Sequence, residues 1–183
     1  MTHRSLAELE PHLEHLAASP RDVGTLELLV CRPAKGTRRI LDEGVLDTQV
    51  GLVGDSWSTR LHKPPRPDKQ VTLMNARMAG LLSPDPQRQA LCGDQLYVDL
   101  DLSAENLPAG TRIEVGDAVV EVSAAPHTGC AIFVRHFGED ATRFVNGRAG
   151  RGLRLRGINA RVVAGGVVRP GDKVTVHREP ALW

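Results

Sequence analysis

The sequence predicts a mainly β domain, either a barrel or a sandwich, that follows one N-terminal helix. Three observations favour this fold class. Short segments rich in Val, Ile, Leu and Thr recur along most of the 183 residues, with the composition of β-strands. Gly, Pro and Asp separate these segments, as expected where tight turns join neighbouring strands. The first residues, by contrast, carry leucines at helical spacing.

The N-terminal helix is predicted from an apolar stripe in which a leucine recurs every three or four positions. The stripe consists of Leu6, Leu9, Leu13 and Leu16. Ser5 stands before the first leucine and is a suitable N-cap, because its hydroxyl can accept from a free N–H of the first turn. Ser19-Pro20 ends the pattern, and we expect one helix of about twenty residues.

Most of the segments that follow have four to eight strand-forming residues. They are "GTLELLVCRP", "GVLDTQVGLVGD", "KQVTLMNA", "QLYVDLDL", "TRIEVGD", "AVVEVSAAP", "INARVVAGGVV" and "DKVTVHRE". Gly-Asp pairs stand beside several of them, at Gly54-Asp55, Gly93-Asp94, Gly116-Asp117 and Gly171-Asp172. The third pair separates "TRIEV" from "AVVEV" and predicts a hairpin, since both residues tolerate the positive φ of a type I′ turn. Several hairpins at short spacing indicate a barrel or a sandwich.

Two helical interruptions and one loop are also predicted. Asn75 suits the N-cap of a helix over "NARMAGLL", and the stretch "GCAIFVRHFGEDATRFVNG" loses the alternating pattern of a strand. The segment "LHKPPRPDKQ" has three prolines in ten residues, so it cannot be a central strand and we expect an exposed loop.

Composition limits the classes of function. With 23 Lys and Arg against 22 Asp and Glu, the net charge of +1 gives no global field for a polyanion. Aromatic residues make up only 3%, which disfavours a stacking platform for single-stranded nucleic acid. The N-terminus lacks the apolar region of a signal peptide, and no run has the length of a membrane span. Three widely spaced cysteines suit a reducing compartment, so we expect a cytoplasmic protein.

A local concentration of arginine is the main candidate for binding an anion. It has six arginines and no acid, and consists of Arg143, Arg148, Arg151, Arg154, Arg156 and Arg161. Such arginines often coat a solvated sheet face. The glycines of "NGRAGRG" favour a phosphate site instead, because backbone N–H groups and guanidinium groups can converge on phosphate oxygens. The stretch matches neither a P-loop nor a dinucleotide-binding fingerprint.

The stretch "PHTGCAIF" is the sharpest local feature, with Cys130 three residues after His127. The cysteine follows a predicted strand, where a loop can present the thiol to a cleft and a helix N-terminus can stabilise the thiolate. From the residues alone, a buried cysteine that acts as a small hydrophobic side chain is the more common case. A zinc site lacks a second pair of ligands, and a Cys-His nucleophile pair cannot be tested from spacing.

Four ordered stretches resemble the MOSC family, the domain named for the C-terminal part of molybdenum cofactor sulfurases. They are "VGLVGD" (50–55), "ENLPAGTRIEVGDAVVEVSAAPHTGC" (105–130), "FVNG" (144–147) and "RGINARVVAGGVVRPGDKVTV" (156–176). The resemblance implies a β-barrel like that of the pyruvate kinase β-barrel domain, with short helices at its mouth. It divides the chain into an N-terminal helix, residues 1–21, and a MOSC β-barrel domain, residues 22–183.

The resemblance also implies a site. Cys130 matches the family's hallmark cysteine, which is a thiolate ligand to the molybdenum of a molybdenum-pterin cofactor (Moco) in amidoxime-reducing members. A persulfide on this cysteine is the alternative proposed for the family. By the same resemblance His127 is a proton donor near the metal, and Thr128 bonds an oxo or pterin group. Arg148 and Arg151 would neutralise the cofactor phosphate, with Asn146 as a further cofactor-binding residue.

This sequence departs from the family pattern at Gly54-Asp55-Ser56-Trp57, where many relatives have Gly-Asp-Arg-His. The additional domains of amidoxime reducers and cofactor sulfurases are not recognisable either. Three hypotheses follow. The first is a small molybdenum-dependent oxidoreductase for N-oxygenated substrates, served by an electron-donor reductase. The second is a non-redox sulfur or cofactor carrier that works with a cofactor-donor protein. The third, an arginine-patch nucleic-acid binder, is disfavoured, and no membrane partner is expected.

Overall fold

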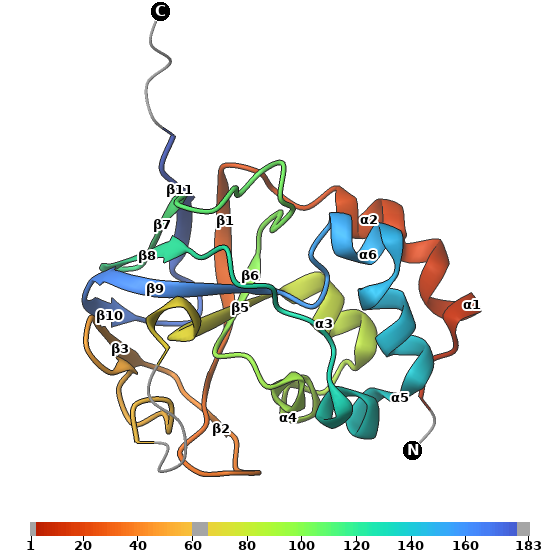
Figure 1. Cartoon of the computed structure of the whole chain (residues 1–183), viewed down its shortest axis with the longest axis horizontal. Coiled ribbons are helices and arrows are strands. Elements are labelled where there is room, and N and C mark those ends of the chain that lie inside the picture. The colour runs from red at the N-terminus through yellow and green to blue at the C-terminus, as the bar shows by residue number, and fades with distance from the viewer. Residues whose placement is uncertain (1–2, 60–65, 179–183) are drawn as a thin grey trace, which may run out of the picture.

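The computed structural model describes residues 3–59 and 66–178, and seven of its strands close a mixed barrel (Figure 1). The barrel order is β11, β7, β8, β9, β5, β6 and β1, and β1 pairs again with β11. Only β5 and β6 are parallel neighbours in this ring of described strands. The strands are β1 (Val23–Cys31), β5 (Val71–Asn75), β6 (Leu96–Asp99), β7 (Arg112–Val115), β8 (Ala118–Val122), β9 (Ile158–Ala164) and β11 (Lys173–Val176). The predicted barrel is confirmed.

Smaller strands extend the barrel at one end. β2 (Arg39–Ile40) pairs with the end of β1, and a separate sheet has the order β10 (Gly166–Val168), β3 (Gly44–Asp47) and β4 (Gly51–Leu52). The predicted hairpin joins β7 and β8, with Val115 opposite Ala118. Its turn differs from the expected type I′, because Gly116 has a φ of 54° and Arg154 is the only non-glycine residue with positive φ in the described part of the chain. Positive φ at the first turn residue alone is the pattern of type II′.

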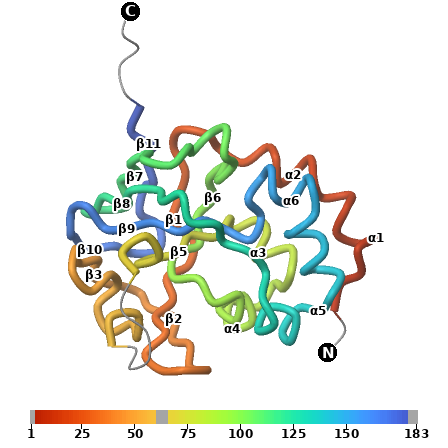
Figure 2. Tube along the Cα trace, viewed as in Figure 1, coloured from red at the N-terminus to blue at the C-terminus, as the bar shows by residue number. Residues whose placement is uncertain are grey.

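The helices lie together on one side of the barrel, and Figure 2 follows the chain from β8 out into α5 and α6 and back to β9. They comprise α1 (Leu6–Leu9), η1 (Glu10–His12), α2 (Leu13–Ala17), α3 (Ala76–Leu82), α4 (Pro86–Gln89), η3 (Ala90–Cys92), α5 (Ala131–Asn146) and α6 (Arg148–Gly152). The short turn η2 (Pro67–Lys69) lies apart from them, against β9. Among the described residues, no helix combines the length and the apolar character that a membrane crossing requires.

Two hydrophobic cores hold the molecule together, one inside the barrel and one beneath the helices. All five residues of β5 are buried, because this strand faces both cores. Leu73 belongs to the barrel core and Met74 to the helical core, as the alternation of side chains along a strand requires. Three phenylalanines of α5, Phe133, Phe137 and Phe144, fill the helical core.

The predicted N-terminal helix is present but is shorter than expected. Ser5 begins it in a capping box with Glu8, whose carboxylate accepts from the Ser5 N–H at 2.8 Å. The expected length of about twenty residues is wrong, because the helical turns α1, η1 and α2 follow one another only from Leu6 to Ala17. Pro11, which has no N–H to donate, falls in the 3₁₀ turn η1 between α1 and α2. Leu9 and Leu16 are nevertheless buried in the helical core.

The other predicted helices are confirmed. The Asn75 side chain caps α3 by accepting from the Met78 N–H at 3.1 Å. α5 covers most of the predicted stretch and kinks at Gly138, which has a φ of 87°. Of the predicted loop "LHKPPRPDKQ", residues 61–65 lie outside the described residues, and the turn η2 follows them.

Candidate functional site

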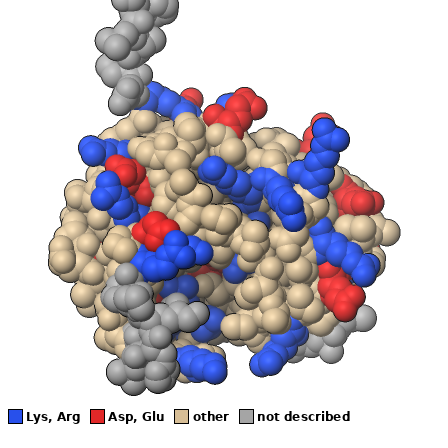
Figure 3. All heavy atoms as spheres, in the orientation of Figure 1, with Lys and Arg blue, Asp and Glu red and all other residues tan. Residues whose placement is uncertain are grey.

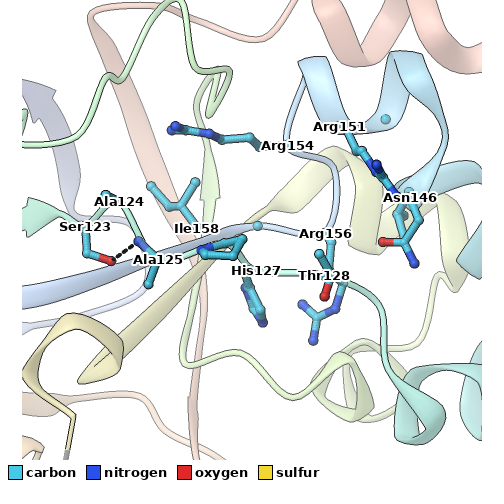
Figure 4. Close-up of a pocket in the computed structure, with 14 residues that line it drawn as sticks. Ser123, Ala124, Ala125, His127, Thr128, Asn146, Arg151, Arg154, Arg156 and Ile158 are labelled. Atoms are coloured by element: carbon cyan, nitrogen blue, oxygen red, sulfur yellow. Dashed lines mark hydrogen bonds between the residues drawn. The ribbon is translucent and has the colours of Figure 1, made fainter.

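A pocket of about 460 Å³ lies at the junction between the barrel and the helices (Figure 4). One wall is the loop from Ser123 to Thr128, which follows β8. The opposite wall comes from the end of α5, from α6 and from the segment 154–158 that leads into β9. The junction exists because the chain leaves the barrel after β8 to form the helices and returns at β9.

Two asparagine side chains fix the loop that forms the first wall. The Asn159 amide donates to the carbonyls of Ala125 and Pro126 at 3.1 and 3.2 Å. The Asn146 side-chain oxygen accepts from the Gly129 N–H at 3.0 Å. Because β9 and the end of α5 each hold the loop, its side chains are positioned before any ligand binds.

Behind the loop, a buried aspartate lies between an arginine and a histidine. Asp94 has no exposed surface, and its Oδ2 accepts from Arg156 Nη1 at 2.6 Å. Arg156 also donates to the Cys92 carbonyl at 2.8 Å, and its guanidinium lies 5.1 Å from the centroid of the Phe133 ring. Burial by itself would lower the pKa of Arg156, but the Asp94 carboxylate raises it, so the guanidinium is charged. The Asp94–Arg156 pair therefore joins the loop before β6 to the start of β9.

His127 contacts the same aspartate from the pocket side. Its Nδ1 lies 3.4 Å from Asp94 Oδ1, and 16% of its side chain is exposed. Burial lowers the pKa of His127 to about 4, an effect that Asp94 opposes and that Arg156 reinforces. The imidazole is therefore neutral at pH 7.

Three arginines of the sequence cluster are neutralised by acids. Arg143 pairs with Glu139 at 3.5 Å on the surface of α5. Arg161 pairs with Glu121 at 2.7 Å across β8 and β9. Arg156 is held by the buried carboxylate described above. These three positions have structural roles and leave only part of the cluster for a ligand.

The pocket itself is positively charged. Arg151 and Arg154 line it, and among the lining residues that the structure describes none is acidic. Arg154 is half-buried, donates to the Leu107 carbonyl at 2.7 Å and has its pKa lowered by burial. Arg148 is exposed on α6 and, within the described chain, is not part of the lining. Figure 3 shows Lys and Arg side chains over α6 and the junction, so an anionic ligand suits this face.

Cys130 is an exposed free thiol at the N-cap of α5, two residues after Thr128 of the lining. The alternative that this cysteine is a buried hydrophobic side chain is wrong. Cys31 and Cys92 are the buried ones, and burial raises the pKa of both thiols. Of the three, only Cys130 is accessible for ligation or sulfur chemistry in the described chain.

The family model of the MOSC domain matches residues 54–175, about two thirds of the chain. The chain belongs to the MOSC domain family. The resemblance found in the sequence is thereby confirmed, and the family is linked to molybdenum cofactor binding.

Solved structures show the same fold. YuaD of Bacillus subtilis superposes with a TM-score of 0.58 at 17% identity, over 86% of this chain and 97% of that one. YiiM of Escherichia coli superposes with a TM-score of 0.55 at 21% identity, over 85% of this chain and 71% of that one. For YiiM of Geobacillus stearothermophilus the TM-score is 0.54 at 14% identity, over 89% of this chain and 76% of that one. No curated protein matches the sequence.

In this MOSC domain, most of the site residues expected from the sequence come together. His127, Thr128, Asn146 and Arg151 line one pocket, and Cys130 stands beside it in the same loop. Arg148 is separated from them, since it is exposed on α6 and is not among the lining residues. Their roles toward a cofactor stay predictions.

Sequence reasoning missed Asp94, the centre of the buried cluster. Its only signal was the pair Gly93-Asp94, which indicates a turn and no more. It also gave Arg154 and Arg156 no role of their own within the arginine cluster, although both line the pocket. These two side chains reach the site because a turn with Arg154 at a φ of 48° precedes β9.

The segment Gly54-Asp55-Ser56-Trp57 keeps the aspartate of the family pattern, and this aspartate has a structural role. The Asp55 carboxylate accepts from Arg32 through Nε at 2.9 Å and Nη2 at 3.1 Å, and from the Trp57 N–H at 3.0 Å. Arg32 also donates to the Gly93 carbonyl at 2.8 Å. In this MOSC domain the aspartate therefore anchors the segment after β1 next to the loop that carries Asp94.

Proposed function

We propose that this MOSC protein binds a molybdenum-pterin cofactor in the junction pocket, with Cys130 as the molybdenum ligand. One observation carries the proposal. An exposed free thiol stands beside a pocket that contains Arg151 and Arg154 and, among its described lining, no carboxylate. A thiolate is a soft ligand suited to a transition metal, and guanidinium groups suit a phosphate.

The donor set fits the cofactor in three respects. The pocket volume of about 460 Å³ lies within the usual range for small-molecule and cofactor sites. Arg151 and Arg154 supply positive charge for the terminal phosphate. The Nδ1 of His127 and the Oδ1 of Asp94 are buried polar atoms without a hydrogen-bond partner among the described residues, as is common at functional sites.

When bound, the molybdenum centre would supply the redox chemistry, and the chain's own residues would bind and orient. Asn146 would hold the Gly129 backbone, and with it the neighbouring Cys130, in a fixed position. The neutral His127 would accept a hydrogen bond from an N–H or O–H of the ligand. Thr128, which is exposed in the lining, would offer a hydroxyl.

We assign the holoprotein to small oxidoreductases that act on N-oxygenated small molecules with electrons from a partner reductase. The second candidate is a carrier in which Cys130 holds a persulfide sulfur, and the exposure of this thiol favours it. The hypothesis of a nucleic-acid binder loses support, because acids pair with three of the six arginines of the cluster.

The test is to purify the protein from molybdate-replete cells that make the pterin cofactor. Molybdenum is measured by mass spectrometry and oxidised pterin by fluorescence in wild type, Cys130→Ala, Arg151→Glu and Arg148→Glu. Arg148→Glu is the matched control, since it reverses the same charge on α6 outside the pocket lining.

We expect near-stoichiometric metal and pterin in wild type, loss of metal in Cys130→Ala, and about tenfold less pterin in Arg151→Glu with Arg148→Glu unchanged. Wild type without metal or pterin would exclude the oxidoreductase. A persulfide on Cys130 in that case would select the carrier.

A further inference from the structure

Three side chains from separate segments converge behind the pocket. Asp94 follows η3, His127 lies in the loop after β8, and Arg156 precedes β9. Figure 4 shows the side chains of His127 and Arg156 extending to the same side of the pocket. An arrangement that joins three segments through buried polar atoms needs a reason, because burial of polar groups costs free energy unless they are paired.

The pairing within this cluster is complete on one side only. Asp94 Oδ2 is bonded to Arg156, which the Cys92 carbonyl and the Phe133 ring hold from its other sides. Asp94 Oδ1 and His127 Nδ1 have no hydrogen-bond partner among the described residues, and they lie 3.4 Å apart. The carboxylate cannot turn toward another donor without breaking its bond to Arg156.

The tautomer of His127 decides whether this contact is attractive. A lone pair on Nδ1 would face a carboxylate lone pair, which is repulsive, whereas a proton on Nδ1 would satisfy both atoms. The Gly157 backbone closes the same edge of the ring, since a Cβ built there would lie 3.2 Å from Nδ1. The charged groups around the ring are Asp94, Arg156, Arg32 and Lys69, and only Asp94 is an acceptor.

The opposite edge of the ring faces the pocket. Nδ1 has almost no exposed surface, yet 16% of the His127 side chain is exposed. His127 lines the pocket, and of its two ring nitrogens only Nδ1 is among the buried atoms that have no hydrogen-bond partner in the described structure, so we place Nε2 on the exposed edge.

We infer that Asp94 and Arg156 are positioning residues that hold His127 as the Nδ1-protonated tautomer, which makes Nε2 a hydrogen-bond acceptor for an N–H or O–H group of the pocket ligand. The ligand is then an anion that also carries a hydrogen-bond donor, with its charge at the arginines and its donor at His127. The identity of that ligand rests on the proposed function, but the tautomer does not.

The test is long-range ¹H–¹⁵N correlation NMR at pH 7 on cofactor-free protein labelled with ¹⁵N-histidine. The sequence has seven histidines, and the His127 signals are assigned by their loss in His127→Gln. We expect a protonated, pyrrole-type Nδ1 and an unprotonated, pyridine-type Nε2. A ring protonated on Nε2, or on both nitrogens, overturns the inference.

Asp94→Asn then tests the cause. Its amide can either donate to or accept from Nδ1, so the tautomer ratio should move toward Nε2–H by about tenfold. The matched control is Asp55→Asn, which alters another buried aspartate paired with an arginine, Arg32, and should leave the His127 ratio unchanged. An unchanged ratio in Asp94→Asn, or an equal shift in both variants, overturns the positioning role.

The two proposals fail separately. A protein that loads no pterin but has the Nδ1-protonated ring overturns the proposed function and leaves this inference standing. A protein that loads metal and pterin but has His127 protonated on Nε2 supports the proposed function and overturns this inference.

Discussion

Replacing Arg156 by methionine should strongly destabilise this protein, because the substitution removes the charge that pairs with Asp94. Methionine is chosen because it keeps most of the buried aliphatic stem, so the loss reports on the charge. The Arg156 side chain is only 6% exposed, and it is the ion-pair partner of Asp94, which has no exposed surface. Removing one partner of a buried ion pair costs about 3–5 kcal/mol, since the other charge stays buried. We expect Arg156→Met to lower the free energy of unfolding by about 4 kcal/mol, which lowers the urea midpoint by about 2 M.

The assay is urea unfolding at pH 7 followed by circular dichroism, with Arg161→Met as the matched control. Arg161 belongs to the same arginine cluster, but its side chain is 53% exposed in its pair with Glu121, so its loss should cost about 0–1 kcal/mol. The double variant Asp94→Leu/Arg156→Met should regain most of the lost stability, because no buried charge is left. If Arg156→Met and Arg161→Met lowered the free energy of unfolding equally, the assignment of Arg156 as a structural arginine would be refuted.

Three further outcomes are expected. Iodoacetamide should label Cys130 alone in the native protein and all three cysteines in denaturant; native labelling of a second thiol would contradict the burial pattern. Gly157→Ala should lower the melting temperature, since its φ is 107° and a Cβ would meet the Leu73 carbonyl at 2.3 Å, whereas Gly152→Ala, which meets nothing within 4 Å, should not. His127 has a folded pKa of about 4 against an ordinary 6.5, so acid should cost up to about 3 kcal/mol of stability between these pH values. In urea titrations at several pH values, His127→Gln should reduce the dependence of the free energy of unfolding on pH. An unchanged pH dependence would refute the assignment of this effect to His127.

The features predicted correctly from the sequence depend on residues close together in the chain. The Asn75 cap, the N-cap position of Ser5 and the hairpin around Gly116 each involve positions within a few residues of one another. The chemistry of turns and caps depends on the residues at those positions, so such features can be predicted from short stretches of sequence. Repeated local patterns of the same kind predicted a barrel or a sandwich, and the family resemblance then implied the barrel.

The features that were missed depend on contacts between distant segments. Asp94 and Arg156 are 62 positions apart, and no periodicity links them. The exposure of Cys130 depends on how α5 packs, which its own sequence does not encode. α6 was not expected, because two glycines in five residues disfavour a helix. It forms where Gly150 packs so closely on α5 that a Cβ would lie 2.1 Å from the Phe144 carbonyl.

The closure of the barrel bears on how the protein is made. β11 fills the gap between β1 and β7, with Val174 opposite Gly24 on one side and Val115 on the other. Until residues 173–176 leave the ribosome, both of those strands present unpaired edges. Pairing of such distant segments is slow to form, so we expect the nascent protein to expose these two edges until β11 pairs with them.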